Sequence, residues 1–216
     1  TFSLLEAIKK NYLYLNFKKF IHISTDEIYG DMGNKKKSFT ELNQIFPSSP
    51  YSASKAASDC LVQAWGRTFK IPYLITNCCN NYGKYQNIEK FIQNSIIKIK
   101  NNQKIPIYGN GNQSREWINA RTHVKYLYKL MKLNVYNQRI NIGSEFRIKN
   151  LDLAKLIVQK IKNSKNYDDH IIFVKDRQGH DVKYQINSNK LYSHIKKINE
   201  NFNYELSNTI KWYWNN

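Results

Sequence analysis

The sequence predicts an α/β fold, and three observations lead to this prediction. Short apolar runs that are typical of buried strands alternate with longer segments in which apolar residues recur at helical spacing. The segments between the first runs are long enough to hold crossover helices, which favours parallel strands. With 216 residues, of which 41% are hydrophobic, the chain is also long enough to bury a core.

The first part of the chain is expected to contain two strands and two helices. A helix at 1–10 follows from apolar residues at a three-residue offset, and the apolar run around FIHIS predicts a strand at 19–24. A polar loop then leads to a long helix that starts near Tyr51, and the run YLITNCC predicts a strand at 73–79. The pattern breaks at NNYGKY, which places a domain boundary near 82–85.

Helices and strands continue to alternate after this boundary. The runs IPIY, RINIG and HIIFV predict strands, and the segments between them have helical periodicity. The expected elements are a helix near 88–100, a strand at 105–108, a helix near 122–132, a strand at 139–143, a helix near 150–162 and a strand at 170–174. We therefore expect two domains, at 1–85 and 86–216.

The charge of the chain is strongly basic. There are 34 Lys and Arg against 16 Asp and Glu, which gives a net charge of +18 and suits an acidic partner such as a nucleic acid or a phosphorylated metabolite. The lysines are scattered, however, and Lys, Asn, Ile and Tyr are all abundant, which codon composition explains. The sequence shows neither zinc-finger spacing nor an aromatic RNA-binding signature, so we expect no nucleic-acid partner.

The cysteines and the hydropathy pattern indicate a compartment. Cys60, Cys78 and Cys79 have neither metal-ligand spacing nor the pattern of a disulfide framework, which predicts a reducing environment and no metal site. Apolar runs stay shorter than the roughly 18 residues that a membrane span needs, and no signal-peptide pattern is present. We expect a cytoplasmic protein without a membrane partner. Because Thr1 lies inside a helical pattern, we also expect something to precede it.

Two groups of residues suggest chemistry. Thr25, Asp26 and Glu27 follow the first strand directly, and open α/β sheets bind ligands at the carboxyl ends of their strands. Tyr51 and Lys55 lie four residues apart, so a helix would place both on one face, where the lysine would lower the pKa of the phenol and make it a base. The alternatives are a solvated strand end and an ordinary surface pair.

A resemblance to a known family joins these groups. The segments HISTDEIYGD, SPYSASKAASD, TNCCNNYGKYQNIEKFI, IPIYGNGNQSREW and DRQGHDVKY occur in this order over nearly the whole chain. In this respect the sequence resembles the dTDP-glucose 4,6-dehydratases of the extended short-chain dehydrogenase/reductase superfamily. The resemblance implies a partial NAD-binding Rossmann-type doubly wound parallel sheet, with the catalytic residues, at 1–85. It also implies a smaller α/β sugar-nucleotide substrate domain, mainly at 86–216.

The resemblance also implies a lyase reaction that converts dTDP-glucose to dTDP-4-keto-6-deoxyglucose, for deoxysugar and surface polysaccharide biosynthesis. Tyr51 would take the proton of the C4 hydroxyl while NAD accepts the C4 hydride. Glu27 would then remove the C5 proton and Asp26 would protonate the leaving C6 hydroxyl, before the hydride returns to C6. Thr25 would hydrogen-bond the C4 oxygen, and Lys55 would tune Tyr51 and hold the nicotinamide ribose.

Further roles follow from the same resemblance. Asn81 would contact the cofactor and Asn80 the substrate, and family members are commonly homodimers. The remaining substrate-binding candidates match positions that hold the nucleotide diphosphate and base or that close over the nucleotide: Lys90, Phe91, Tyr108, Arg115, Asn150, Asp176, Arg177 and His180.

The sequence departs from the family in two places. Ala120 and Arg121 stand where an acidic pair is usual, which bears on helix capping there. The family's first roughly one hundred residues, with the glycine-rich turn that seats the pyrophosphate, have no counterpart. Three hypotheses therefore remain: a dehydratase known from a partial sequence, a degenerate non-catalytic remnant that binds nucleotide, and a basic nucleic-acid-binding module.

Overall fold

A computed structural model describes residues 1–13, 16–33, 37–176 and 181–216. The helices are α1 (Phe2–Asn11), α2 (Pro50–Phe69), α3 (Phe91–Lys100), α4 (Ala120–Lys132), α5 (Asn150–Lys162), α6 (Asn189–His194) and α7 (Phe202–Asn215), and η1 (Asp26–Tyr29) is a short 3-10 helix. The strands are β1 (Phe20–Thr25), β2 (Tyr73–Cys78), β3 (Asn80–Tyr82), β4 (Ile105–Tyr108), β5 (Ser114–Asn119), β6 (Gln138–Ile142), β7 (Arg147–Lys149) and β8 (Ile171–Val174).

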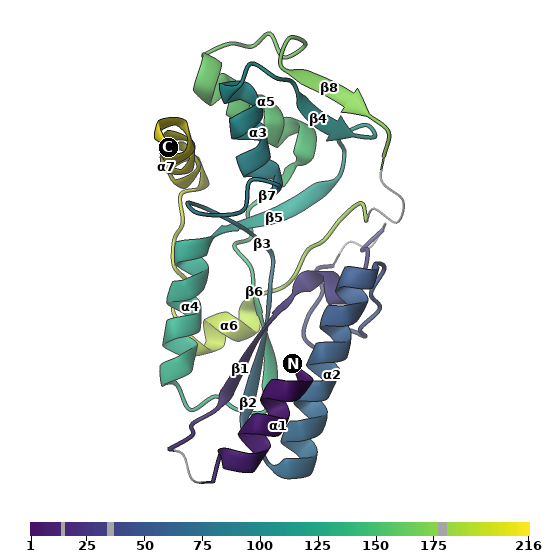
Figure 1. Cartoon of the computed structure of the whole chain (residues 1–216), viewed down its shortest axis with the longest axis vertical. Coiled ribbons are helices and arrows are strands. Elements are labelled where there is room, and N and C mark those ends of the chain that lie inside the picture. The colour runs from purple at the N-terminus through teal and green to yellow at the C-terminus, as the bar shows by residue number, and fades with distance from the viewer. Residues whose placement is uncertain (14–15, 34–36, 177–180) are drawn as a thin grey trace.

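The first sheet has the order β1-β2-β6, and all of its strands are parallel. Helices cover both faces, as Figure 1 shows for its lower part: α1 and α2 lie on one side, α4 and α6 on the other. Successive residues of β2 point to opposite faces. Ile75 packs against Leu5 and Val62 of α1 and α2, whereas Leu74 packs among side chains of α4 and α6. This doubly wound arrangement confirms the predicted fold class.

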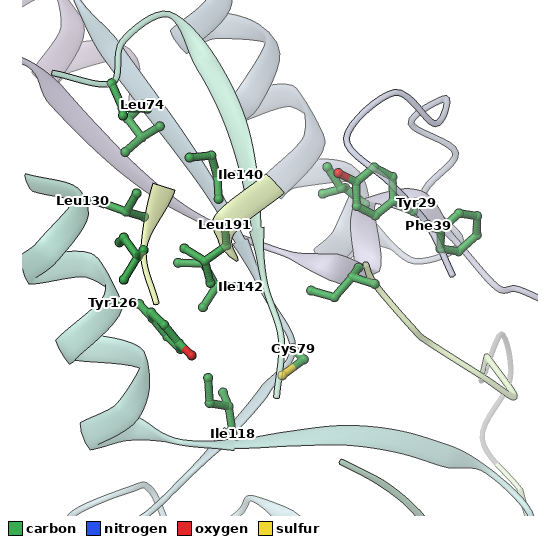
Figure 2. Close-up of a cluster of buried hydrophobic side chains, with 14 of the residues drawn as sticks. Tyr29, Phe39, Leu74, Cys79, Ile118, Tyr126, Leu130, Ile140, Ile142 and Leu191 are labelled. Carbon is green, nitrogen blue, oxygen red and sulfur yellow. The ribbon is translucent and has the colours of Figure 1, made fainter. Parts of the chain in front are cut away.

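The larger core lies between the first sheet and its second helical layer. Figure 2 shows Tyr126 and Leu130 of α4 beside Ile140 and Ile142 of β6, with Leu191 of α6 among them. All of these side chains are buried. Because α6 comes from near the end of the chain, burial of these apolar groups ties the carboxyl-terminal part to the first sheet.

The long helix α2 begins with a strong local signal. Ser49 and Ser52 form a reciprocal capping box, and Pro50 occupies the first helical turn, where its missing N–H costs nothing. The helix ends at Phe69 and is followed by the C-cap residue Lys70, which has left-handed backbone angles of φ 58° and ψ 26°. The cap fixes where the helix starts, and thereby places Tyr51 in its first turn.

A second body holds the remaining sheets, in the upper part of Figure 1. There β5 pairs with β3 in parallel and with β7 antiparallel, and β4 pairs with β8 in parallel. Helices α3, α5 and α7 pack around an aromatic-rich core that includes Tyr82, Trp117 and Phe202. The two bodies are continuous, because β2 and β3 follow each other almost directly and β5 runs straight into α4.

The expected strands and the long helices near their expected positions are confirmed, but β3, β5, β7, α6 and α7 were not expected. The sequence of β5, SREWIN, places Arg115 and Glu116 in a strand, and both are buried. The strand expected at 139–143 pairs with β2 in the first sheet, although it follows the boundary near 82–85. Where the family's acidic pair is absent, Asn119 caps α4 by accepting a hydrogen bond from the N–H of Arg121 at 2.9 Å.

None of the helices in the described residues is both long and apolar enough to cross a membrane. The same part of the chain holds no group of three or more His, Cys, Asp or Glu side chains that could bind a metal ion.

Candidate functional site

The Thr25-Asp26-Glu27 run forms a tight turn at the carboxyl end of β1. Thr25 caps η1, since its hydroxyl oxygen accepts a hydrogen bond from the N–H of Glu27 at 3.3 Å. Gly30 ends η1 with φ 75°, and a Cβ there would lie 2.2 Å from the carbonyl oxygen of Phe46. The turn therefore requires glycine at this position. It presents its side chains at the sheet edge where ligands bind in open α/β folds.

Tyr51 and Lys55 reach the same edge from α2. The side chain of Tyr51 is solvent-accessible, with the residue 55% exposed. The Lys55 ammonium donates a hydrogen bond to the carbonyl oxygen of Ile23 in β1, at 2.7 Å. This contact holds the exposed face of α2 against the end of β1. The Tyr-Lys pair therefore shares one site with Thr25, Asp26 and Glu27, which we call the acidic turn.

The electrostatic environment separates the two acids of the turn. Asp26 is only 2% exposed, and burial raises its pKa well above the ordinary value, with further contributions from the negative charges of Glu27 and Glu116. Arg115 opposes this effect. A raised pKa favours the protonated form, which can donate a proton. Asp26 is thus suited to act as an acid.

The pKa of Tyr51 differs from the expectation. Partial burial raises it, and the negative charge of Glu27 adds to the effect. The predicted lowering of the Tyr51 pKa by Lys55 is therefore wrong for the chain as described. The physical reason is the fold, which brings Glu27 and Asp26 near the phenol while Lys55 bonds a backbone carbonyl.

Two adjoining cavities open at this edge. The smaller cavity, of about 330 Å³, is lined by the acidic turn, the start of α2 and the segment that joins β2 to β3. The larger cavity, of about 680 Å³, extends into the second body along α3, β4 and β5. The residues that line both are Glu27, Asn80, Lys90, Phe91 and Trp117. The two cavities together form a site that crosses from one body to the other.

Most of the predicted site residues line these cavities. The smaller cavity is lined by Thr25, Asp26, Glu27, Tyr51, Lys55, Asn80, Asn81, Lys90 and Phe91. The larger cavity adds Tyr108, Arg115 and Asn150. Asp176 is not among the lining residues of either, and it accepts a hydrogen bond from the side-chain amide of Gln113 at 3.0 Å. Arg177 and His180 lie outside the described residues.

Arg115 is held in place by the segment 181–184. Its guanidinium donates to the carbonyl oxygens of Asp181 and Val182 at 2.7 and 3.1 Å, and it stacks on the ring of Tyr184 with 4.6 Å to the centroid. The Asp181 carboxylate in turn accepts hydrogen bonds from Ser48 and Tyr184. These contacts tie the larger cavity to the loop that precedes α2.

Asn81 is oriented by His123, a buried histidine on α4. His123 Nδ1 lies 2.9 Å from the Asn81 side-chain oxygen, and the Asn81 amide donates to the carbonyl oxygen of Cys79 at 3.1 Å. Burial lowers the pKa of His123 from 6.5 to about 4, so the ring is neutral near pH 7. It can then donate from Nδ1 and fix the asparagine amide.

The sequence analysis also missed several cavity-lining residues. Trp117 lies in the unexpected strand β5, two residues after Arg115 in the quoted segment IPIYGNGNQSREW. Ser49, Asp181 and Tyr184 reach the larger cavity from distant parts of the chain. The capping signal Ser-Pro before Tyr51 was available for Ser49, and DRQGHDVKY already contained Asp181 and Tyr184.

Comparisons with known proteins agree with this geometry. The family model described as GDP-mannose 4,6 dehydratase matches residues 1–212. A dTDP-glucose 4,6-dehydratase of Haemophilus influenzae is 41% identical over 227 residues, which cover 99% of this chain and 67% of the relative. The enzyme of the same name from Neisseria meningitidis is 39% identical, and the match covers 100% of this chain and 65% of that relative. The chain thus spans about two thirds of the length of these relatives.

Solved structures show the same fold. A dTDP-glucose 4,6-dehydratase from Bacillus anthracis in complex with NAD has a TM-score of 0.89 and 32% identity, over 99% of this chain and 66% of that one. The enzyme of the same name from Streptomyces venezuelae, also with NAD, has a TM-score of 0.91 and 30% identity, over 99% and 64%. Neither a nucleic-acid-binding module nor a non-catalytic remnant finds support in these similarities.

Proposed function

The chain belongs to the dTDP-glucose 4,6-dehydratase family, and from this premise we propose that it carries the catalytic and substrate-binding part of such an enzyme. The substrate would be dTDP-glucose and the product dTDP-4-keto-6-deoxyglucose. The observation that carries the proposal is that Asp26, Glu27 and Tyr51 line one cavity, with the pKa of the buried acid raised. Residues 1–85, with β6, would form the catalytic domain, and most of 86–216 the substrate domain.

The residues around the smaller cavity fit an NAD cofactor. Ile23 offers an exposed apolar surface at the end of β1, next to the Lys55 ammonium and the Asn81 amide. Apolar surface suits a nicotinamide ring, and the polar groups suit a ribose and a carboxamide. NAD, when bound, would supply the hydride acceptor, the later hydride donor and a positive charge. Lys55 would hold the ribose, and Asn81 would contact the cofactor.

Tyr51 and the three residues of the acidic turn have distinct tasks in this proposal. Tyr51 would accept the proton of the C4 hydroxyl, and its raised pKa means that this task needs additional positive charge nearby. Thr25 would hydrogen-bond the C4 oxygen. Glu27 would remove the C5 proton that the new ketone has acidified. Asp26 would protonate the leaving C6 hydroxyl, a task that its buried, protonated form favours.

The larger cavity would hold the nucleotide diphosphate and base. Asn80 lies where the cavities adjoin and would contact the sugar, and Arg115 is the phosphate candidate. Three backbone carbonyl oxygens already accept hydrogen bonds from the Arg115 guanidinium. Only its remaining N–H groups would therefore donate to the diphosphate. The remaining candidates are Lys90, Phe91, Tyr108, Asn150, Asp176, Arg177 and His180.

The compartment and the oligomeric state of the active protein also belong to the proposal. We place it in the cytoplasm, where its three free cysteines would stay reduced. We also propose a homodimer. Phe2 and Leu4 on α1 are more than half exposed, which supports a partner on this side of the first sheet.

The experiment that tests the proposal uses Glu27→Gln in the active protein that contains this chain. Oxidation at C4 does not need Glu27, whereas removal of the C5 proton does. Addition of dTDP-glucose should therefore give a transient increase in the absorbance of reduced nicotinamide that the wild type does not show. Glu205→Gln on α7 is the matched control and should behave as wild type. Absence of this build-up would contradict the division of roles.

A further inference from the structure

A buried polar cluster lies directly beneath the site, and none of the steps above uses it. Asp59 and Asn77 are fully buried, and Arg139 and His22 are nearly so. Asp59 comes from α2, Asn77 from β2, Arg139 from β6 and His22 from β1. Helix α2 and strands β1 and β2, which carry residues of the smaller cavity, therefore also carry residues of the cluster. The cluster therefore connects the parts of the chain whose relative position determines the site geometry.

Asp59 stands at the centre of the cluster. It follows Lys55 by four residues, as Lys55 follows Tyr51, so all three lie on one face of α2. Arg139 donates to the Asp59 carboxylate, and His22 Nε2 lies 3.1 Å from its other oxygen. Burial opposes ionisation of Asp59, but His22 and Arg139 outweigh it and hold the pKa of the carboxyl below its ordinary value. Asp59 is thus a buried charge fixed by its partners.

The second half of the cluster reaches the acidic turn. The Asn77 amide donates to the backbone carbonyl oxygen of Thr25 at 2.9 Å, while its own oxygen accepts a hydrogen bond from Arg139 at 2.8 Å. Arg139 therefore bridges Asp59, which lies one helical turn after Lys55, and Asn77. Asn77 in turn donates a hydrogen bond to Thr25, where the acidic turn begins. An unbroken chain of contacts runs from α2 to Thr25.

A gain in stability is a weak explanation for this arrangement. A buried ion pair loses so much hydration that apolar residues of similar size are often as stabilising or more so. We propose that Asp59, Asn77 and Arg139 are positioning residues that fix the Thr25-Asp26-Glu27 turn relative to Tyr51 and Lys55. Their catalytic relevance rests on the proposed function, whereas the positioning itself concerns only this chain.

The test compares two substitutions on neighbouring residues of β2. Asn77→Leu removes the hydrogen bond to the Thr25 carbonyl and the one that Asn77 accepts from Arg139. Thr76→Val removes an equally buried bond from β2 to β1, in which the Thr76 hydroxyl donates to the carbonyl of His22 at 3.4 Å, away from the turn. Amide hydrogen exchange is measured on the protein that contains this chain. The probes are Glu27 and Gly30, whose N–H groups bond within the turn.

Asn77→Leu should accelerate exchange of these two amides about tenfold, equal to about 1.4 kcal/mol, without changing exchange in α3. Thr76→Val should leave the turn as in wild type. Equal effects of both substitutions, or no effect of Asn77→Leu, would overturn the proposal. If Asn77→Leu does not fold, the double variant Asp59→Asn with Arg139→Met removes both charges together and should show the same local acceleration; normal exchange there would also overturn it.

Activity provides a second, separable readout. In the active protein, Asn77→Leu should lower kcat about tenfold or more with little change in KM, since the nucleotide pocket is untouched. If the wild-type protein shows no dehydratase turnover, the proposed function fails while the exchange experiment still decides the positioning role. A loss confined to KM would contradict positioning of the catalytic groups.

Discussion

Acidification is expected to destabilise the fold through His123. This histidine packs in α4 with its ring buried, and burial lowers its pKa from 6.5 to about 4. The unfolded chain takes up the proton near pH 6.5, whereas the folded chain takes it up only near pH 4. Because the folded pKa is depressed, stability is complete above the unfolded pKa and decreases as the pH falls from about 6.5 towards 4.

The size of this effect follows from the shift. A displacement from 6.5 to about 4 corresponds to about 3 kcal/mol in total, of which about 2 kcal/mol is lost between pH 7.5 and pH 5. Urea unfolding of the wild type and of His123→Gln at these two pH values measures the difference, since other titrating groups contribute equally to both. His194→Gln, at an exposed position on α6, is the control and should retain the wild-type dependence. If His123→Gln loses as much stability on acidification as the wild type, the assignment of a buried neutral ring is refuted.

Two further substitutions test the site, and a third tests the packing around the buried Glu116 carboxylate. Tyr51→Phe in the active protein should abolish oxidation of dTDP-glucose, so no reduced nicotinamide should form in a single-turnover absorbance measurement; a normal signal would remove Tyr51 as the base. Asp26→Asn should slow water loss by roughly 10²- to 10⁴-fold while exchange of the C5 hydrogen with deuterated solvent persists, which mass spectrometry follows; loss of both would assign Asp26 a different role. Gly143→Ala would place a Cβ 2.3 Å from a Glu116 side-chain oxygen that accepts the Ser144 N–H, and urea unfolding should show a loss of about 1–3 kcal/mol; unchanged stability would show that Glu116 can move.

The sequence predicted those parts of the fold whose signal is local. The apolar run of β1 and the cap of α2 are local, and the elements appear where they were expected. Strand β3 has only three residues, and β5 buries Arg115 and Glu116, so neither has the alternation of a typical strand. Their pairing partners lie elsewhere in the chain, and only the folded structure reveals them.

For the site, too, the features with a local signal could be predicted and those that depend on long-range contacts could not. The acidic turn and the Tyr-Lys pair could be named from motifs, because each lies within a few residues. The pKa of Tyr51 could not be predicted, since it depends on how far the phenol is buried and on Glu27, which the fold brings to it from another element. Likewise, Asp59 meets Arg139 across 80 residues of chain, so no local pattern marks their contact.

The central claim is that the acidic turn and Tyr51 serve an elimination in which the hydride leaves C4 and returns to C6 of the same sugar. The most direct measurement uses dTDP-glucose with deuterium at C4 and the active protein that contains this chain, with the product analysed by mass spectrometry and NMR. The account predicts a 4-keto-6-deoxy sugar that retains the deuterium, located at C6. A product that has lost the label, or a sugar that is altered only at C4 with no loss of water, would contradict it.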